Sequence, residues 1–212
     1  MRVIMVIVAV MCCMSFGGGC TKVIVVPPKA IMPAPAPAPA PVQVPHKSSW
    51  MLRSEFSTSL RKAGTGKIHN VKLAAEILEG HIIRPGEMFS YNEVVGSRDK
   101  TRGFLDAPSF LNKKVVKSVG GGVCQLSSTL HGAIVLAETK VAGIEVVERH
   151  KHSLPVHYCP SWAEATVSYG SKDLKFINNT GSDIRIATRV VRENGVWKLT
   201  VEIWQKAETS RR

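Results

Sequence analysis

The sequence lacks several features that would set its class at once. No internal repeat and no zinc-finger, RNA-recognition or helix-turn-helix signature appears along its 212 residues. The longest apolar run, residues 3–16, would reach about 21 Å as a helix, which is short of the hydrocarbon thickness of a bilayer. These absences argue against a repeat protein, a nucleic-acid reader of those classes and a membrane-spanning helix.

Acidic residues are scarce. The chain has 16 Asp and Glu against 28 Lys and Arg, which gives a formal net charge of +12. A basic balance of this size favours polyanionic partners such as nucleic acid, anionic lipid headgroups or the acidic polymers of a bacterial wall. Lys and Arg spread over a solvated surface is the alternative explanation. The hydrophobic share of 44% fits a packed core.

Cysteine is also sparse, and much of it lies at the start of the chain. Arg2 precedes the apolar run 3–16, and small residues at 17–19 lead to Cys20. This order resembles a bacterial lipoprotein signal, although Gly17 stands where Leu is usual. We predict a signal peptide at 1–19 and lipidation of Cys20, with plain secretion or a retained anchor as the alternative. We therefore expect a membrane-anchored protein on the extracytoplasmic face of the cell envelope, with no nucleic-acid partner.

Proline is concentrated in one segment. Eight of the 12 prolines fall between Pro27 and Pro45, in a Pro/Ala-rich stretch at 21–47. Such a segment stays extended at about 3.1 Å per residue, so it would hold a domain roughly 50–60 Å from the membrane. A Pro-rich ligand for another domain is the alternative. The folded domain is predicted at 50–208.

The domain has helical patterns early and strand patterns late. Asn70 is a plausible N-cap for a helix that closes at Gly80, and the apolar spacing predicts a second helix over 124–138. Asn194-Gly195 suits a tight hairpin turn. Strands are predicted at 88–91, 144–148, 165–169, 173–177, 183–190 and 196–204. The fold class is α+β, with N-terminal helices packed on a mostly antiparallel C-terminal sheet.

Cys124 is the candidate nucleophile. It follows three glycines and begins a predicted helix, where unpaired N–H groups and the helix dipole stabilise a thiolate. The same N–H groups could hold an oxyanion. His150 and His152 follow a predicted strand and would share a face, so either could be the base. Asp173 or Glu148 could orient that histidine.

Other roles for these residues remain open. Cys124 could form a disulfide with Cys159 or be an inert buried thiol, and the two histidines could be structural. The residues His150, His152, His157 and Cys159 could instead bind a metal, but their spacing matches no standard zinc motif. We predict no metal and no cofactor. His131 lies about 10 Å from Cys124 along the helix, which suggests packing.

Several long motifs occur in order along the domain. They are FSTS (56–59), PGEMFSYN (85–92), GGGVCQLSSTL (120–130), ERHKHS (148–153), ATV (165–167) and DLKFINNT (173–180). From about residue 54 to 186 the chain resembles the VanW-like family. It departs from the family pattern at His131, Trp162, His157 and Cys159. Glu164 stands where Asp is more usual and keeps a carboxylate that is one methylene longer.

The resemblance implies a function in the cell wall. The family is named for an accessory gene of glycopeptide-resistance clusters. Some members act as L,D-transpeptidases that form 3→3 cross-links between peptidoglycan stem peptides, with a cysteine nucleophile at the position of Cys124. An L,D-carboxypeptidase, or a non-catalytic peptidoglycan-binding accessory module on a lipid tether, is the alternative.

The predicted site combines catalytic residues with substrate and oxyanion contacts. The catalytic residues are Cys124, His152, His150 and Asp173. The predicted substrate and oxyanion contacts are Gly121, Gly122, Gln125, Ser127, Ser128 and Arg149. The expected partners are peptidoglycan stem peptides and the membrane, and the sequence predicts no oligomeric state.

Overall fold

The computed structural model describes residues 49–111 and 114–207. The predicted signal peptide at 1–19, Cys20 and the linker at 21–47 lie outside the described residues. Within the described part of the chain, no helix is both long and apolar enough to cross a membrane.

The largest element is an antiparallel sheet of four strands. In spatial order these are β1 (Trp50–Ser59), β9 (Val196–Lys206), β8 (Ile184–Glu193) and β2 (Ile82–Ile83). Strands β8 and β9 form a long hairpin whose turn has positive φ at Asn194 (49°) and Gly195 (80°), as a tight turn requires. The predicted hairpin and the α+β class are both confirmed.

Two smaller sheets complete the strand structure. One has three strands in the order β3 (Met88–Ser90), β7 (Lys175–Asn178), β6 (Ile144–Glu148). The other is the hairpin of β4 (Asp106–Leu111) and β5 (Lys114–Val119). Short helical segments, α2 (Tyr91–Val95) and the 3-10 turn η2 (Lys100–Arg102), connect β3 to this hairpin.

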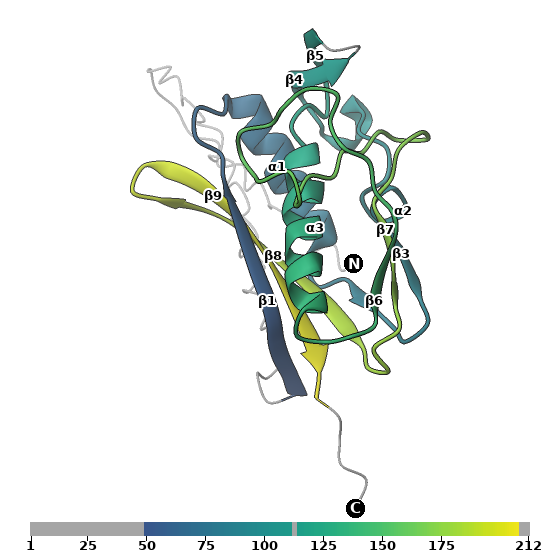
Figure 1. Cartoon of the computed structure of the whole chain (residues 1–212). Coiled ribbons are helices and arrows are strands. Elements are labelled where there is room, and N and C mark those ends of the chain that lie inside the picture. Colours follow the sequence, from purple (N-terminus) through teal and green to yellow (C-terminus); the bar gives the residue numbers. More distant parts are fainter. Residues whose placement is uncertain (1–48, 112–113, 208–212) are drawn as a thin grey trace, which may run out of the picture. The chain divides into compact units, whose positions relative to one another are not determined.

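Helix α3 (Cys124–Glu138) is the centre of the domain and has the bounds predicted from the sequence. It contacts β1 and β9 on one side and β6 on the other, so it lies between the four-stranded and three-stranded sheets (Figure 1). Because it is covered from both sides, even the polar residues of its first two turns are buried. Because an unbonded buried polar group is costly, most of these groups form hydrogen bonds, and Gln125 Oε1 is a buried atom that has no partner among the described residues.

Helix α1 (Thr65–Leu78) packs against β8 and begins earlier than predicted. Gly64 occupies the N-cap, and Asn70 is a buried residue inside the helix. The prediction of Asn70 as N-cap was wrong because its side chain makes tertiary bonds. The Nδ2 group donates to the carbonyls of Leu105 (2.8 Å) and Gly121 (3.0 Å), and Oδ1 accepts from the Leu105 N–H (2.8 Å).

The structure also corrects the strand predictions. Strand β1 and the β4–β5 hairpin were not predicted. Residues 165–169 form no named strand, and only an isolated bridge joins Ser168 to Lys172. The physical reason is that the Ala165 backbone bonds side chains of α3: its N–H donates to Ser128 Oγ (3.0 Å), and its carbonyl accepts from Ser127 Oγ (2.6 Å).

Close packing of α3 on β1 gives a stability prediction. A Cβ added at Gly132 would lie 2.5 Å from Cδ1 of Phe56. We expect Gly132→Ala to lower the free energy of unfolding by about 1–3 kcal/mol through overpacking, although Ala in an exposed helix would raise it by about 1 kcal/mol. Urea unfolding would measure the change.

The matched control is Gly64→Ala. A Cβ there meets nothing within 4 Å, and its φ of −70° is one that Ala adopts. We expect this variant to change the free energy of unfolding by a few tenths of a kcal/mol at most, because loss of freedom in the unfolded chain offsets the weaker cap. Equal effects of the two substitutions would contradict close packing at Gly132.

Candidate functional site

A cavity of about 830 Å³ lies at the N-terminus of α3. Both Cys124 and His152 line it, together with Lys67 from α1 and Tyr158 from the irregular segment that follows β6. The structure therefore brings the candidate nucleophile together with one of its two candidate bases.

The glycines before Cys124 allow close packing of the chain. A Cβ at Gly121 would lie 2.2 Å from the Ala107 carbonyl oxygen, and one at Gly122 would lie 2.5 Å from Cγ of Lys67. Gly122 also has a φ of 98°, which side chains rarely adopt. Gly121 is further fixed by its bond from Asn70. These glycines bring two other segments against the start of α3, and Gly122 in addition lines the cavity.

The thiol of Cys124 contacts the segment after Glu164. Its Sγ donates to the Val167 carbonyl (3.4 Å) and lies 3.5 Å from Thr166 Oγ1. Burial raises the pKa of the thiol, but hydrogen bonds from the His152 and Thr166 side chains, together with the charge of His152, outweigh burial. The net effect is a pKa below the ordinary value. A lowered pKa supplies the thiolate that acts as a nucleophile.

His152 is held from several sides, and its side chain is only 2% exposed. One oxygen of Glu164 accepts from the His152 backbone N–H (3.3 Å) and lies 3.5 Å from Nδ1. The Tyr158 hydroxyl is 3.2 Å from Nε2. The Cys124 thiol, His152 and the Glu164 carboxylate are therefore neighbours, and these are the residue types found in nucleophile–base–orienter groups.

Tyr158 ties the histidine to the nucleophile. Its hydroxyl also reaches the Cys124 carbonyl (3.4 Å) and Ser128 Oγ (3.4 Å). Burial raises the pKa of Tyr158, so the hydroxyl stays protonated and remains a donor. Sequence reasoning missed both Tyr158 and the contact of Glu164 with His152, because both residues lie in irregular segments where no periodicity places a side chain.

The predicted oxyanion donors differ in availability. The Gln125 N–H donates to the Gly122 carbonyl (3.0 Å), so it is engaged within the first turn. The Gln125 side chain donates to the Ser59 carbonyl (2.9 Å) and Thr58 Oγ1 (3.0 Å), which joins α3 to the end of β1. Within the described part of the chain, no hydrogen bond uses the Cys124 N–H. That N–H is the donor at the nucleophile that remains for a ligand.

Ser127, Ser128 and Arg149 lie behind the cavity. Both serines are fully buried and bond the Ala165 backbone. The Arg149 guanidinium donates to the carbonyls of Glu164 (2.6 Å) and Ser161 (2.9 Å). These three residues, predicted as substrate contacts, hold the 161–165 segment in place, and none of them lines the cavity.

His150 and Asp173 lie apart from the Cys124 cavity. Strand β6 ends at Glu148, so the alternation that would put His150 and His152 on one face stops before either residue. His150 is 39% exposed, and its Nε2 is 3.0 Å from a carboxylate oxygen of Glu148. Asp173 accepts from the hydroxyl of Ser90 (2.5 Å) and the N–H of Asn92 (2.9 Å).

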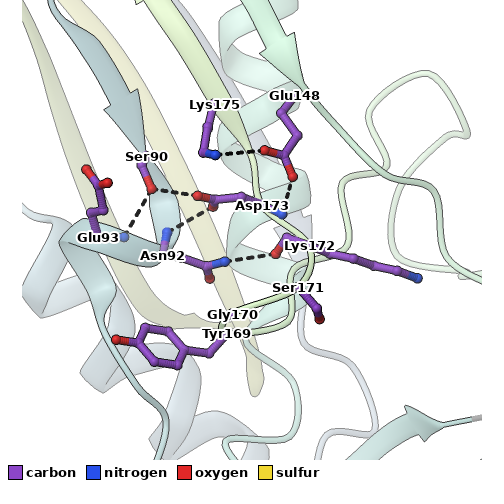
Figure 2. A pocket seen from close by; sticks show the side chains of 10 residues that line it. All are labelled: Ser90, Asn92, Glu93, Glu148, Tyr169, Gly170, Ser171, Lys172, Asp173 and Lys175. Atoms are coloured by element: carbon purple, nitrogen blue, oxygen red, sulfur yellow. Dashed lines mark hydrogen bonds and ion pairs between the residues drawn. The ribbon is translucent and has the colours of Figure 1, made fainter.

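Figure 2 shows the second cavity, of about 560 Å³, which Asp173 and Glu148 line. The Glu148 carboxylate contacts Lys175 Nζ (2.9 Å) and accepts from the Asp173 N–H (2.9 Å). Hydrogen bonds from Lys175 first and His150 second lower the pKa of Glu148 to about 2. Within the structure, the carboxylate beside His152 is Glu164, and Asp173 organises this other cavity.

The remaining candidates can now be placed. Cys124 and Cys159 are both free thiols. Among the described residues, no group of three or more His, Cys, Asp or Glu side chains is arranged so that it could hold a metal ion. His131 is buried with Nδ1 3.2 Å from the Ala163 carbonyl, and burial lowers its pKa to about 4.

Comparison with known proteins adds the family. A family model described as VanW like protein matches residues 66–204, which is more than half of the chain. The chain belongs to the VanW-like family. The matched region contains all the cavity residues named above that come from α1, α3 and the segment after β6. No solved structure matches the chain.

Two curated relatives are similar to a large part of this chain. Uncharacterized protein YoaR of Bacillus subtilis (strain 168) is 35% identical over 135 residues, covering 64% of this chain and 43% of that protein. Vancomycin B-type resistance protein VanW of Enterococcus faecalis (strain ATCC 700802 / V583) is 33% identical over 125 residues, covering 57% of this chain and 44% of that protein. The matches thus span less than half the length of each relative.

The environment of the two thiols predicts different reactivity. We expect iodoacetamide to alkylate Cys124 with a pH midpoint below the ordinary cysteine value of about 8.5. Burial first, and then Glu164, raises the pKa of Cys159 to about 11, so Cys159 should react only at high pH. Mass spectrometry of the labelled peptides separates the two sites.

The variant His152→Ala tests the cause of this difference. Loss of the imidazole removes both its hydrogen bond and its charge, so the Cys124 midpoint should rise while that of Cys159 stays unchanged. A common midpoint for the two cysteines in the unsubstituted protein would contradict an activated thiol.

Proposed function

We propose that this protein is a cysteine-dependent L,D-transpeptidase of the cell envelope, which joins peptidoglycan stem peptides by 3→3 cross-links. The observation that carries the proposal is the pairing of Cys124 and His152 in one cavity at a helix N-terminus, with the pKa of the thiol lowered. Membership of the VanW-like family supports the same assignment.

The first half-reaction forms a thioester. The Cys124 thiolate attacks the carbonyl carbon of the third residue of a tetrapeptide stem, and a carbon–sulfur bond forms. As the tetrahedral intermediate collapses, the bond to the nitrogen of the terminal D-Ala breaks, and His152 gives that nitrogen its proton. D-Ala leaves with a free amine. The Cys124 N–H donates to no described residue, so it is suited to stabilise the oxyanion.

The second half-reaction forms the cross-link. The side-chain amine of a second stem attacks the thioester and gives its proton to His152, and the thiolate leaves. One amide bond is broken and one is formed, so the reaction needs no oxidant or energy source. Attack by water on the same thioester would instead give an L,D-carboxypeptidase. The partners of the proposed enzyme are therefore stem peptides that present a carbonyl and an amine.

The proposed place of action follows from the sequence. The predicted export signal at 1–19, lipidation at Cys20 and linker at 21–47 would tether the domain on the extracytoplasmic side of the membrane, near the wall. The name of the Enterococcus faecalis relative refers to vancomycin resistance. We extend that association to this protein as part of the proposal.

A product assay tests the enzyme. Full-length protein, purified and reduced, is mixed with disaccharide-tetrapeptide muropeptides and the products are analysed by mass spectrometry. We expect dimers together with free D-Ala, and in Cys124→Ala a loss of at least about 10³-fold in rate, since the nucleophile is absent.

The controls separate the outcomes. D-Ala release without dimers would identify a carboxypeptidase. If the folded wild-type protein gives neither product but binds peptidoglycan as well as Cys124→Ala does, the chain is a non-catalytic wall-binding module and the proposal fails. The substitution Cys159→Ala should leave the rate unchanged, because this thiol is outside the cavity.

Glu164 is proposed as a positioning residue for His152. In Glu164→Gln the amide no longer stabilises positive charge on the imidazole, so the pKa of Cys124 should rise and kcat should fall by about 10- to 100-fold, with less change in KM. The alkylation–pH profile of Cys124 and steady-state kinetics measure the two effects.

The matched control is Glu145→Gln. Glu145 is exposed on β6 and lines neither described cavity, so the same chemical change should leave both measurements unaltered. If the role of Glu164 is purely structural, Glu164→Gln will lower the free energy of unfolding but leave the alkylation midpoint of Cys124 as it is in the unsubstituted protein.

A further inference from the structure

Lys67 enters the cavity from a part of the chain that carries none of the cysteine or histidine motifs. It lies in the first turn of α1, and its aliphatic stem crosses Gly122, whose added Cβ would be 2.5 Å from Lys67 Cγ. Its Nζ lies 5.3 Å from the ring centre of Tyr158. The absence of a side chain at Gly122 thus lets the ammonium group reach the cavity that holds Cys124.

The described lining of the cavity offers this ammonium group no carboxylate, and its one anionic group is the Cys124 thiolate that the reaction uses. That lining includes Arg61 and Lys62 as well as Lys67, and no Asp or Glu among the described residues. None of the ion pairs formed by described residues includes Lys67. Burial lowers the pKa of Lys67, and the nearby charge of Cys124 acts in the opposite direction. A partly buried ammonium group that no described carboxylate neutralises favours an anionic ligand.

We infer that Lys67 binds the free terminal carboxylate of the donor stem peptide and thereby selects stems that end one residue after the attacked carbonyl. This inference rests on the proposed function. In a tetrapeptide stem, that carboxylate is separated from the attacked carbonyl only by an amide nitrogen and one α-carbon. Cys124 and Lys67, which line the same cavity, then act on the two ends of one residue. A pentapeptide stem would place its carboxylate one residue farther along.

Binding to an unreactive variant tests the inference without catalysis. In the full-length Cys124→Ala protein, calorimetry compares a tetrapeptide stem that ends in a D-Ala carboxylate with the same peptide ending in a carboxamide. We expect the carboxamide to bind about 10-fold more weakly, a loss typical of one charge-assisted contact. Adding Lys67→Met, or Lys67→Gln if the first variant folds poorly, should remove this preference. The substitution should weaken the binding of the carboxylate peptide and leave the binding of the carboxamide peptide unchanged.

Lys72→Met is the matched control. Lys72 is on the same helix, but its Nζ lies over the Trp197 ring, 3.7 Å from the centre, and it does not line the cavity. This substitution removes the same charge from the protein and should leave the preference for the carboxylate intact. If it removed the preference equally, the effect would belong to net charge, and the assignment to Lys67 would be overturned.

The outcomes also separate this inference from the proposed reaction. Equal binding of the two peptides by Cys124→Ala would overturn the carboxylate site, even if the wild-type protein made cross-links. Persistence of the preference after Lys67→Met is added to Cys124→Ala would overturn it too, and a raised Cys124 alkylation midpoint in Lys67→Met alone, with Cys124 present, would then assign Lys67 to the thiolate. Loss of the preference in Lys67→Met, with no D-Ala released by the wild type, would support the carboxylate site and refute the reaction.

Discussion

The constraint on which the rest of the structure depends is the burial of α3 between two sheets while its first two turns are polar. An unbonded polar group in such a place costs about 1–3 kcal/mol, and the polar side chains of these turns all form hydrogen bonds, with Gln125 Oε1 as the one buried atom among them that accepts none from the described residues. Gln125 bonds the end of β1, Ser127 and Ser128 bond the Ala165 backbone, and Thr129 donates to the Gln125 carbonyl (2.6 Å). These bonds fix the surrounding segments relative to the helix, so the polarity of α3 organises the site.

The same packing around α3 separates the acidic side chains of the second cavity from the Cys124 thiol. The segment 165–173 runs from the Cys124 thiol, which contacts Thr166 and Val167, to the second cavity, where Asp173 and Glu148 lie. Acidic groups gather in that second cavity, whereas the described lining of the first has only basic charges. A carboxylate close to the thiol would raise its pKa, so keeping most acids on the far side of this segment favours a reactive cysteine. Glu164, placed behind His152, is the acid near the site.

Sequence patterns predicted α3 and the β8–β9 hairpin, missed β1 and the β4–β5 hairpin, and predicted the assembly of the site only in part. The bounds of α3 and the identity of Cys124 at its start follow from the glycines and the apolar spacing, which are local signals. Asn70 was misplaced because its type suits a cap, whereas three-dimensional contacts with Leu105 and Gly121 decide its position. No periodicity in the sequence shows which irregular or distant segments come together in the fold. The positions of Lys67, Tyr158 and Glu164, which contacts His152, therefore could not be predicted.

The bonds from Ser127 and Ser128 to Ala165 have a mechanical consequence. Thr166, which contacts the thiol, is the next residue after Ala165, and Tyr158 bonds both Ser128 and the Cys124 carbonyl. The nucleophile and the groups around it are thus all bonded to helix α3. When the sheets on either side of α3 move, the reacting atoms move together with the helix. Their mutual alignment is therefore less sensitive to domain motion than it would be in a site whose residues came from two independent layers.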